Sequence, residues 1–131
     1  MAEIIITGRL GVGLGKGKYF MRQNGYKRQF VEKLRINPFH GTLNVELADG
    51  ELRKLNMFRG KKGILIKGFA RGKRTFGNVR AYKADISGIR CALVVPERTT
   101  HSNIAEIISS EMLRKKLGIA EGEKVTITVF V

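Results

Sequence analysis

This chain has few of the residues that mark secreted or membrane-bound proteins. Its 131 residues include a single cysteine, Cys91, which excludes an internal disulfide. No apolar run approaches the roughly 20 residues that a membrane-spanning helix needs. The start, Met1-Ala2-Glu3, lacks the basic region and cleavage site of a signal peptide. We therefore expect a cytoplasmic protein that does not bind membranes.

Acidic residues are also scarce. The chain has 25 Lys and Arg but 11 Asp and Glu, which gives a formal net charge of +14. Residues 52–84 contain no acid, and between Ile4 and Val45 the only acid is Glu32. Such an excess indicates either a polyanionic partner, nucleic acid or a polyphosphate, or a well-solvated surface suited to salt or heat. For residues 52–84 the charge alone does not choose between these readings.

Linker-like segments and internal repeats are absent too. With an ordinary apolar fraction of 43%, residues 1–131 are expected to form one domain. Many short strands in a domain of this size predict a mainly β fold, a closed β-barrel with short helical insertions. The strands are expected, from alternation or short apolar runs, over residues 3–12, 42–48, 64–66, 76–83, 89–95 and 125–131.

Helices are expected at three places. Tyr26, Phe30 and Leu34 recur at helical spacing and predict a helix over residues 24–35, which Asn37-Pro38 would stop. A second helix is expected near Asn103, with Glu106 as its capping-box partner. A third is expected over residues 111–117, with Ser110 as its N-cap and Gly118 just past its end. Asp49-Gly50 predicts a turn.

A glycine-rich run follows the first predicted strand. In Gly13-Leu14-Gly15-Lys16-Gly17-Lys18, three glycines let the backbone approach a ligand closely, and two lysines add positive charge. Backbone N–H groups and ammonium groups together form a phosphate cradle. The spacing fits neither the P-loop nor the dinucleotide fingerprint. A bulge or tight turn is therefore the structural alternative.

Thr42 and Asn44 are candidate metal ligands. They lie two residues apart in a predicted strand and so project from the same face. Hydroxyl and amide oxygens suit Mg²⁺ when phosphates and waters complete its shell. Carboxylates are the more usual ligands, and a structural Thr/Asn pair at a turn is the alternative reading.

Two further groups of residues are candidates for ligand binding. Thr99, Thr100, His101 and Ser102 form a polar cluster after Pro96 and serve either a ligand or a capping loop. Arg114 lies near the start of a predicted helix, where free N–H groups attract anions. A solvated basic helix end is the alternative for Arg114.

Taken in order, these motifs resemble those of the archaeal CTP-dependent riboflavin kinases. The resemblance covers nearly the whole chain, although residues 50–85 contain nothing diagnostic. It implies a compact six-stranded β-barrel of the cradle-loop, or RIFT, type. It also implies transfer of the γ-phosphoryl group of CTP to the 5′-hydroxyl of riboflavin, with FMN and CDP as products. The stretches that carry it are Gly13–Phe20, Pro38–Asn44, Val94–Ser102, Glu106-Ile107-Ile108 and Met112-Leu113-Arg114.

The same resemblance implies a role for each candidate residue. The glycine-rich run, Gly13 to Lys18, would bind the nucleotide together with Glu111, Met112, Leu113 and Arg114. Thr42 and Asn44 would hold Mg²⁺. Thr99 and Glu106 would contact the flavin, and Glu106 would act either as a catalytic base or as a positioning group. We expect a monomer.

Two other functions stay open. A nucleic-acid-binding barrel would explain the charge, with Phe58, Phe69, Phe76 and Tyr82 available to stack on bases. Single-strand binders usually interleave many aromatic residues with basic ones, and here aromatics make up 8% with no tryptophan, so nucleic acid is the less favoured partner. The other alternative is a flavin or nucleotide sensor on the same barrel without catalysis.

Overall fold

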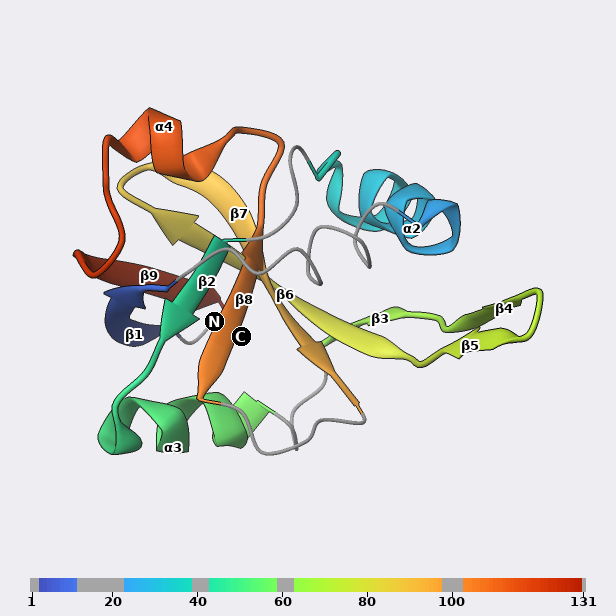
Figure 1. The fold of residues 1–131 in the computed structure, drawn as a ribbon, viewed down its shortest axis with the longest axis horizontal. Coiled ribbons are helices and arrows are strands. Elements are labelled where there is room, and N and C mark those ends of the chain that lie inside the picture. Colours follow the sequence, from blue (N-terminus) through green and yellow to red (C-terminus); the bar gives the residue numbers. More distant parts are fainter. Residues whose placement is uncertain (1–2, 12–22, 39–42, 59–62, 98–102, 131) are drawn as a thin grey trace.

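The structure is a computed structural model that describes residues 3–11, 23–38, 43–58, 63–97 and 103–130 (Figure 1). Most of its regular elements are strands. The strands are β1 (Glu3–Leu10), β2 (Leu43–Glu46), β3 (Ile64–Ile66), β4 (Phe69–Arg71), β5 (Arg74–Phe76), β6 (Val79–Ile86), β7 (Ile89–Pro96), β8 (Ile104–Ile108) and β9 (Lys124–Phe130). The helices are α2 (Asn24–Leu34), α3 (Asp49–Phe58) and α4 (Leu113–Leu117).

Six strands close into an antiparallel barrel. Their order is β6-β7-β8-β2-β1-β9, and β9 pairs back with β6 through Ala84 opposite Val129 and Asp85 opposite Thr128. Closure leaves these strands without an open edge on which another chain could pair. The predicted mainly β fold, a closed six-stranded barrel with short helices, is confirmed.

The barrel interior is filled by alternate residues of its strands. Ile6, Val45, Leu93, Ile107 and Ile127 are fully buried members of one apolar cluster there. Strand β1 approaches β2 so closely that a Cβ on Gly8 would lie 2.4 Å from the carbonyl oxygen of Glu46. A glycine is therefore required at this position, and it lets the barrel close tightly.

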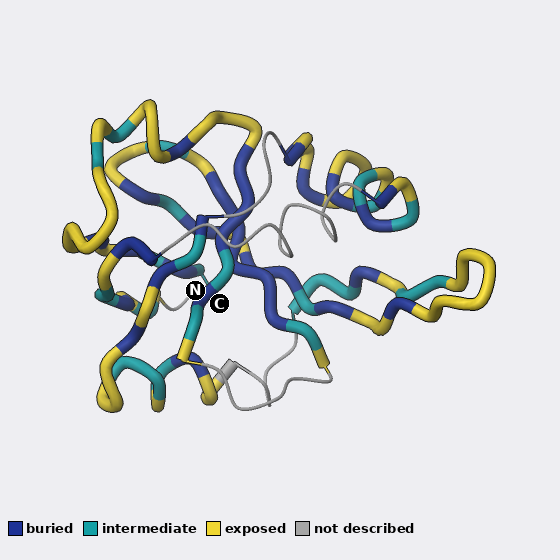
Figure 2. The backbone as a smooth tube through the Cα atoms, viewed as in Figure 1, coloured by how far each residue is buried: buried dark blue, intermediate teal, exposed yellow. Residues whose placement is uncertain are grey.

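A second apolar cluster lies on the outer face of the barrel, beneath α2. Tyr26, Phe30 and Leu34 point from the helix toward residues of β6, β7 and β8, which include Ala92 and Ile108. Figure 2 shows this inner side of α2 in dark blue and its outer side exposed. The helical spacing of the three apolar residues thus predicted both the helix and the side that packs.

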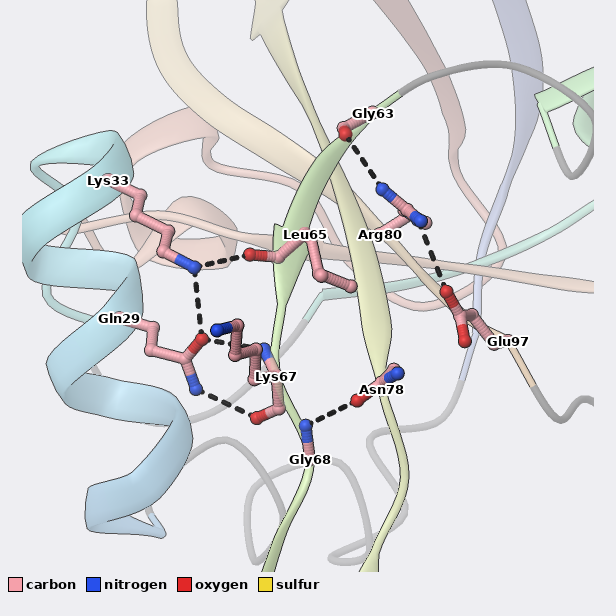
Figure 3. A network of polar contacts seen from close by, with 9 residues as sticks. All are labelled: Gln29, Lys33, Gly63, Leu65, Lys67, Gly68, Asn78, Arg80 and Glu97. Carbon is pink, nitrogen blue, oxygen red and sulfur yellow. Dashed lines mark hydrogen bonds and ion pairs between the residues drawn. The ribbon is translucent and has the colours of Figure 1, made fainter.

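Strand β3 lies outside the closed barrel and pairs with β6 alone among the described strands. Its other edge is covered by α2 (Figure 3). The Gln29 side chain donates to the Lys67 carbonyl at 2.8 Å and accepts from the Lys67 N–H at 2.6 Å. Lys33 Nζ donates to the Leu65 carbonyl at 2.6 Å. These side chains stand in for a neighbouring strand and protect the edge.

Helix α3 replaces the turn expected at Asp49-Gly50, so that prediction was wrong. Asp49 and Glu51 occupy its first turn, where carboxylates stabilise the positive end of the helix dipole. Glu51 also accepts a hydrogen bond from the Thr7 N–H at 3.1 Å. Leu55 is buried in the barrel cluster and Leu52 packs against it. Burial of these leucines and the Glu51 contact favour helix over a turn.

The helix expected near Asn103 is also wrong, because residues 104–108 form strand β8. Ala105 and Ile107 point into the barrel, and β8 pairs with β2 on one side and β7 on the other. A strand between two partners satisfies its backbone on both sides, whereas a short helix there would leave one edge of β2 and one edge of β7 without the pairing that β8 provides. Glu106 therefore lies on a strand and caps no helix.

The third helix is shorter than expected. Helix α4 begins at Leu113, and its N-cap Met112 makes no side-chain capping bond. Ser110 is not the N-cap, because its hydroxyl instead accepts a hydrogen bond from the Asn37 N–H at 2.9 Å. The expected end is correct, since Gly118 is the C-cap with φ of 62°.

The strand expected over residues 76–83 is two strands. Strand β5 ends at Phe76 and β6 begins at Val79. Strands β4 and β5, joined at Gly72-Lys73, form a hairpin that projects from the barrel (Figure 1). Across the described part of the chain, no helix combines the length and apolar character needed to cross a bilayer.

Candidate active site

Asn44 and Glu106 lie directly opposite each other on adjacent strands. Asn44 is on β2, Glu106 is on β8, and the antiparallel register pairs them. Their chain neighbours point into the barrel, so both side chains project from its outer face. Directly opposite residues have Cβ atoms roughly 4.5–5.5 Å apart. The barrel thus places an amide beside a carboxylate, although the residues are far apart in sequence.

Glu106 lies in a largely apolar setting. It is half-buried, it pairs with Val94 of β7, and Ile108 follows it on the same strand. Burial raises the pKa of the Glu106 carboxyl above its usual range. No hydrogen bond or ion pair joins its carboxylate to any of the residues described. A carboxyl in this setting accepts a proton more readily than an exposed one.

Gly11 connects the β2–β8 strand pair to α4 and to the glycine-rich run. Its N–H donates to the Asn44 carbonyl at 2.8 Å, and its own carbonyl accepts from Arg114 Nη2 at 3.3 Å. A Cβ on Gly11 would lie 3.1 Å from Glu46 Cγ, so the backbone passes close to β2. Gly11 is the last described residue before the glycine-rich run. The chain that leads into that run is therefore fixed between β2 and α4.

The residues just before α4 take different positions. Glu111 is exposed, and its N–H donates to Ser109 Oγ at 3.2 Å. Met112 is exposed, whereas Leu113 is buried in the barrel cluster. The buried side chain of Leu113 therefore anchors α4 on the barrel. The next residue, Arg114, contacts the segment that leads to the glycines.

Several predicted site residues lie outside the described residues. These are the glycine-rich run over 13–18, the metal candidate Thr42 and the flavin candidate Thr99. Thr42 directly precedes Leu43, the first residue of β2, in the sequence. The structure therefore places Asn44, Glu106 and Arg114 relative to one another and leaves the other roles as predictions.

The described oxygen atoms fit a magnesium ion better than a softer metal. No group of three or more His, Cys, Asp or Glu residues is gathered in the part of the chain that the structure describes. The Asn44 amide carries a hard oxygen atom, the type Mg²⁺ accepts when phosphates and waters complete its shell. The described ligand candidate thus fits the predicted metal.

Sequence reasoning missed Gly11 as a site residue. The sequence predicts Gly11 within the first strand, over residues 3–12, whereas β1 ends at Leu10. The available signal was a glycine at a strand end, which often marks a close approach of another backbone. The contacts of Gly11 with Asn44 and Arg114 show that the motifs meet through the main chain.

These features define a class of protein: a closed six-stranded barrel with two facing polar residues on its outer face and a cation linked to them through Gly11. The chain belongs to the family of CTP-dependent riboflavin kinase domains, whose model, described as domain of unknown function DUF120, matches residues 11–129. This membership confirms the resemblance found in the sequence.

Curated relatives agree with the family match. The chain is 40% identical over 128 residues to a riboflavin kinase of Thermoplasma acidophilum, with 98% of this chain and 58% of the relative covered. It is 42% identical over 127 residues to a riboflavin kinase of Archaeoglobus fulgidus, with 96% and 54% covered. For the riboflavin kinase of Pyrobaculum aerophilum the identity is 41% over 130 residues, with 98% and 62% covered. The chain thus spans little more than half the length of these relatives.

Proposed function

We propose that this chain is a riboflavin kinase that transfers the γ-phosphoryl group of CTP to the 5′-hydroxyl of riboflavin. The observation that carries the proposal is the pairing of Asn44 with Glu106, beside the Gly11 main chain that also contacts Arg114. A metal candidate and a flavin candidate are thereby neighbours, and a nucleotide candidate is linked to them through Gly11. Family membership and the riboflavin kinase relatives support the same reaction.

The nucleotide is proposed to bind between the glycine-rich run and α4. Lys16, Lys18 and the glycine N–H groups would hold the phosphates, and Arg114 would keep the preceding Gly11 in place. Phosphoryl transfer depends mainly on positioning and on neutralising charge. A fixed main chain with nearby cations provides both.

Asn44 and Thr42 are proposed to hold Mg²⁺. A bound Mg²⁺ supplies positive charge that neutralises the phosphate oxygens during transfer. Both protein ligands are neutral, so phosphates and waters must complete the shell. We expect weak Mg²⁺ binding without nucleotide. Isothermal titration that finds micromolar Mg²⁺ affinity in the absence of nucleotide would contradict this assignment.

Glu106 is proposed to hold the flavin with Thr99. A raised pKa makes Glu106 a competent proton acceptor for the riboflavin hydroxyl. The loose transition state of phosphoryl transfer makes little demand on a base. We therefore assign Glu106 first to positioning of the ribityl chain, with proton transfer as the second role.

The proposal is tested by incubating the protein with riboflavin and Mg²⁺ and each of the four nucleoside triphosphates in turn. We expect FMN to form fastest with CTP. Faster turnover with ATP would contradict the CTP assignment and leave the kinase assignment standing. Absence of FMN with every donor, in a protein that still binds riboflavin, would favour the sensor alternative.

The structure weakens the alternative of a single-strand nucleic-acid binder. Phe76 and Tyr82 are buried, and Phe69 is half-buried with its ring stacked on Phe76 at 4.7 Å between centroids. The side chain of Phe58 lies outside the described residues. Rings packed in this way do not offer a stacking surface to bases.

A further inference from the structure

The acid-free part of the chain contributes to a strongly basic surface made of residues to which the proposed kinase function assigns no role. Three exposed cations lie on the projecting hairpin, and we call them the hairpin cluster: Arg71, Lys73 and Arg74. The described residues from 63 to 84 include no acid. Figure 2 shows the tip of the hairpin fully exposed.

A second group of cations surrounds a recess at the other end of α2. The recess has a volume of about 160 Å³, enough for a phosphate group. Three cations of its lining form the recess cluster, Arg35, Lys83 and Arg90, whereas the ammonium group of Lys33 is bonded to the Leu65 carbonyl. One acid lies nearby, because Asp85 pairs with Arg90 across β6 and β7 and accepts a hydrogen bond from the Gly88 N–H at 2.9 Å.

Helix α2 joins the two clusters. At its start, Gln23 accepts a hydrogen bond from Arg71 Nη1 at 3.0 Å, which ties the helix to the hairpin. At its end, Arg35 supplies a carbonyl to Arg90 Nη2 at 2.8 Å. Eleven helical residues span roughly 16 Å. The clusters thus lie beside opposite ends of α2, whose length is somewhat greater than the roughly 12 Å width of the B-DNA major groove.

Few acids offset this charge. Glu51 pairs with Lys54 and Glu97 pairs with Arg80, and these two acids lie outside both clusters. On α2 itself the one acid is Glu32, which is exposed between Arg28 and Arg35. Like charges gathered on one surface repel each other in the folded state. A polyanion bound across both clusters would relieve that repulsion.

The chemistry of the surface selects phosphates over bases. The aromatic rings of the hairpin face α2: Phe69 packs edge-on against Tyr26 at 4.9 Å between centroids, and Phe76 does so at 6.0 Å. Arg74 lies over the Phe76 ring at 5.5 Å. The exposed groups are therefore cations without stacking platforms, which suits the regular phosphate backbone of a duplex and not an unstacked single strand.

We propose that this surface binds the phosphate backbone of double-stranded nucleic acid, with the hairpin cluster on one strand and the recess cluster on the other. The interaction is independent of base sequence. It uses a face of the protein that the kinase assignment leaves without a role.

The test is fluorescence anisotropy of the full chain with a labelled 16-base-pair RNA duplex, the matching DNA duplex and the corresponding single strands. Binding should favour the duplexes and weaken steeply with salt. About six phosphate contacts predict a slope near −5 for log affinity against log salt on DNA. Tighter binding to the single strands than to the duplexes would overturn the proposal.

Charge-reversal variants locate the surface. The triple variant Arg71→Glu, Lys73→Glu, Arg74→Glu should weaken duplex binding at least 10-fold and make the salt slope shallower by about 3. The double variant Arg35→Glu, Lys83→Glu should weaken it separately. The matched control is Arg53→Glu, Lys116→Glu, Lys124→Glu, which makes the same charge change at exposed positions on α3, α4 and β9.

The control decides the interpretation. An equal loss of binding in the control and hairpin variants would show that net charge alone is responsible, which overturns the proposal. FMN formation and thermal unfolding of each variant check that the barrel is intact. Because the substituted residues have no role in the proposed kinase reaction, failure of duplex binding leaves the proposed kinase activity untouched.

Discussion

Glu106 is the residue whose role most affects the proposed chemistry. Its carboxyl is half-buried beside Asn44, and its pKa is raised by burial. A raised pKa is compatible with a base, and the position beside the metal candidate is compatible with holding the acceptor hydroxyl. Kinetics and binding measured together separate these roles, because a base acts on turnover and a positioning group acts on both.

The variant Glu106→Gln keeps the size of the side chain and removes its basicity. We expect a loss of kcat under about 10-fold together with a comparable rise in the riboflavin Kd, as for a positioning group. A general base contributes typically 10²–10⁴-fold. A loss of that size with unchanged riboflavin binding would assign Glu106 as the base instead. Glu121→Gln, at an exposed position with no assigned role, is the control for the charge change.

Glu51 links stability to pH. The Thr7 N–H and then Lys54 lower the pKa of the Glu51 carboxyl below its usual value of 4.5. Because its pKa is lowered in the folded state, Glu51 stabilises the fold at pH values above its usual pKa. This contribution is lost as the pH falls through the lowered pKa. At pH 7, Glu51→Gln should therefore be less stable than the parent by on the order of 1 kcal/mol.

The difference in unfolding free energy between the parent and Glu51→Gln should narrow below about pH 4.5 and vanish toward pH 2, where both side chains are neutral. Urea unfolding at several pH values measures it. Glu123→Gln, at an exposed position, should show no such convergence. A difference for Glu51→Gln that stays constant from pH 7 to pH 2 would refute the assigned cause.

At the scale of elements, α2 both packs on the barrel and covers the edge of β3, and the sequence indicates only the first of these roles. Its apolar spacing predicted that Tyr26, Phe30 and Leu34 pack on the barrel. The polar contacts of Gln29 and Lys33 with the edge of β3 are visible only once the helix and strand lie side by side (Figure 3). Sequence periodicity does not identify a side chain that replaces a strand partner.

Replacing Gln29 with Ala should free the Lys67 backbone groups. The variant loses two hydrogen bonds to Lys67 at a solvent-exposed edge, together with those to the Gly25 carbonyl and to Lys33 Nζ, so unfolding should become easier by about 1–2 kcal/mol. The Lys67 amide should also exchange with solvent much faster than in the parent. Arg28→Ala on the exposed side of α2 is the control. Unchanged exchange at Lys67 would show that α2 does not protect this edge.

Other elements show where local patterns stop being informative. Residues 104–108 form a strand because β2 and β7 flank them, and their five residues alone do not distinguish strand from helix. Helix α3 was missed because Asp49-Gly50 resembles a turn and the contacts of Leu52 and Leu55 are made with distant strands. Strands β4 and β5 have three residues each, too few to show alternation.

At the scale of the whole molecule, the strand order of the barrel brings the candidate site residues together. Asn44 and Glu106 were both predicted as site residues, but their pairing depends on the register of strands that are distant in the sequence. The hydrogen bond from Arg114 to the Gly11 carbonyl likewise joins residues that are far apart in the sequence. Candidate residues could be predicted from motifs, whereas their arrangement requires the fold.

The net charge of +14 should influence how the nucleotide reaches the site. A strongly positive protein attracts a polyanionic nucleotide, and salt screens that attraction. We expect the KM for CTP to rise severalfold between 50 mM and 500 mM KCl, while the KM for uncharged riboflavin changes little. Steady-state kinetics measure both values. A KM for CTP that stays flat would remove electrostatic attraction from the account.

The most direct measurement of the central claim is a crystal structure of the protein soaked with CDP, riboflavin and Mg²⁺. The account predicts nucleotide phosphates against the glycine-rich run next to Gly11, Mg²⁺ near Asn44, and the ribityl chain within hydrogen-bond distance of Glu106. A structure with both ligands bound on a face that excludes Asn44 and Glu106 would contradict it.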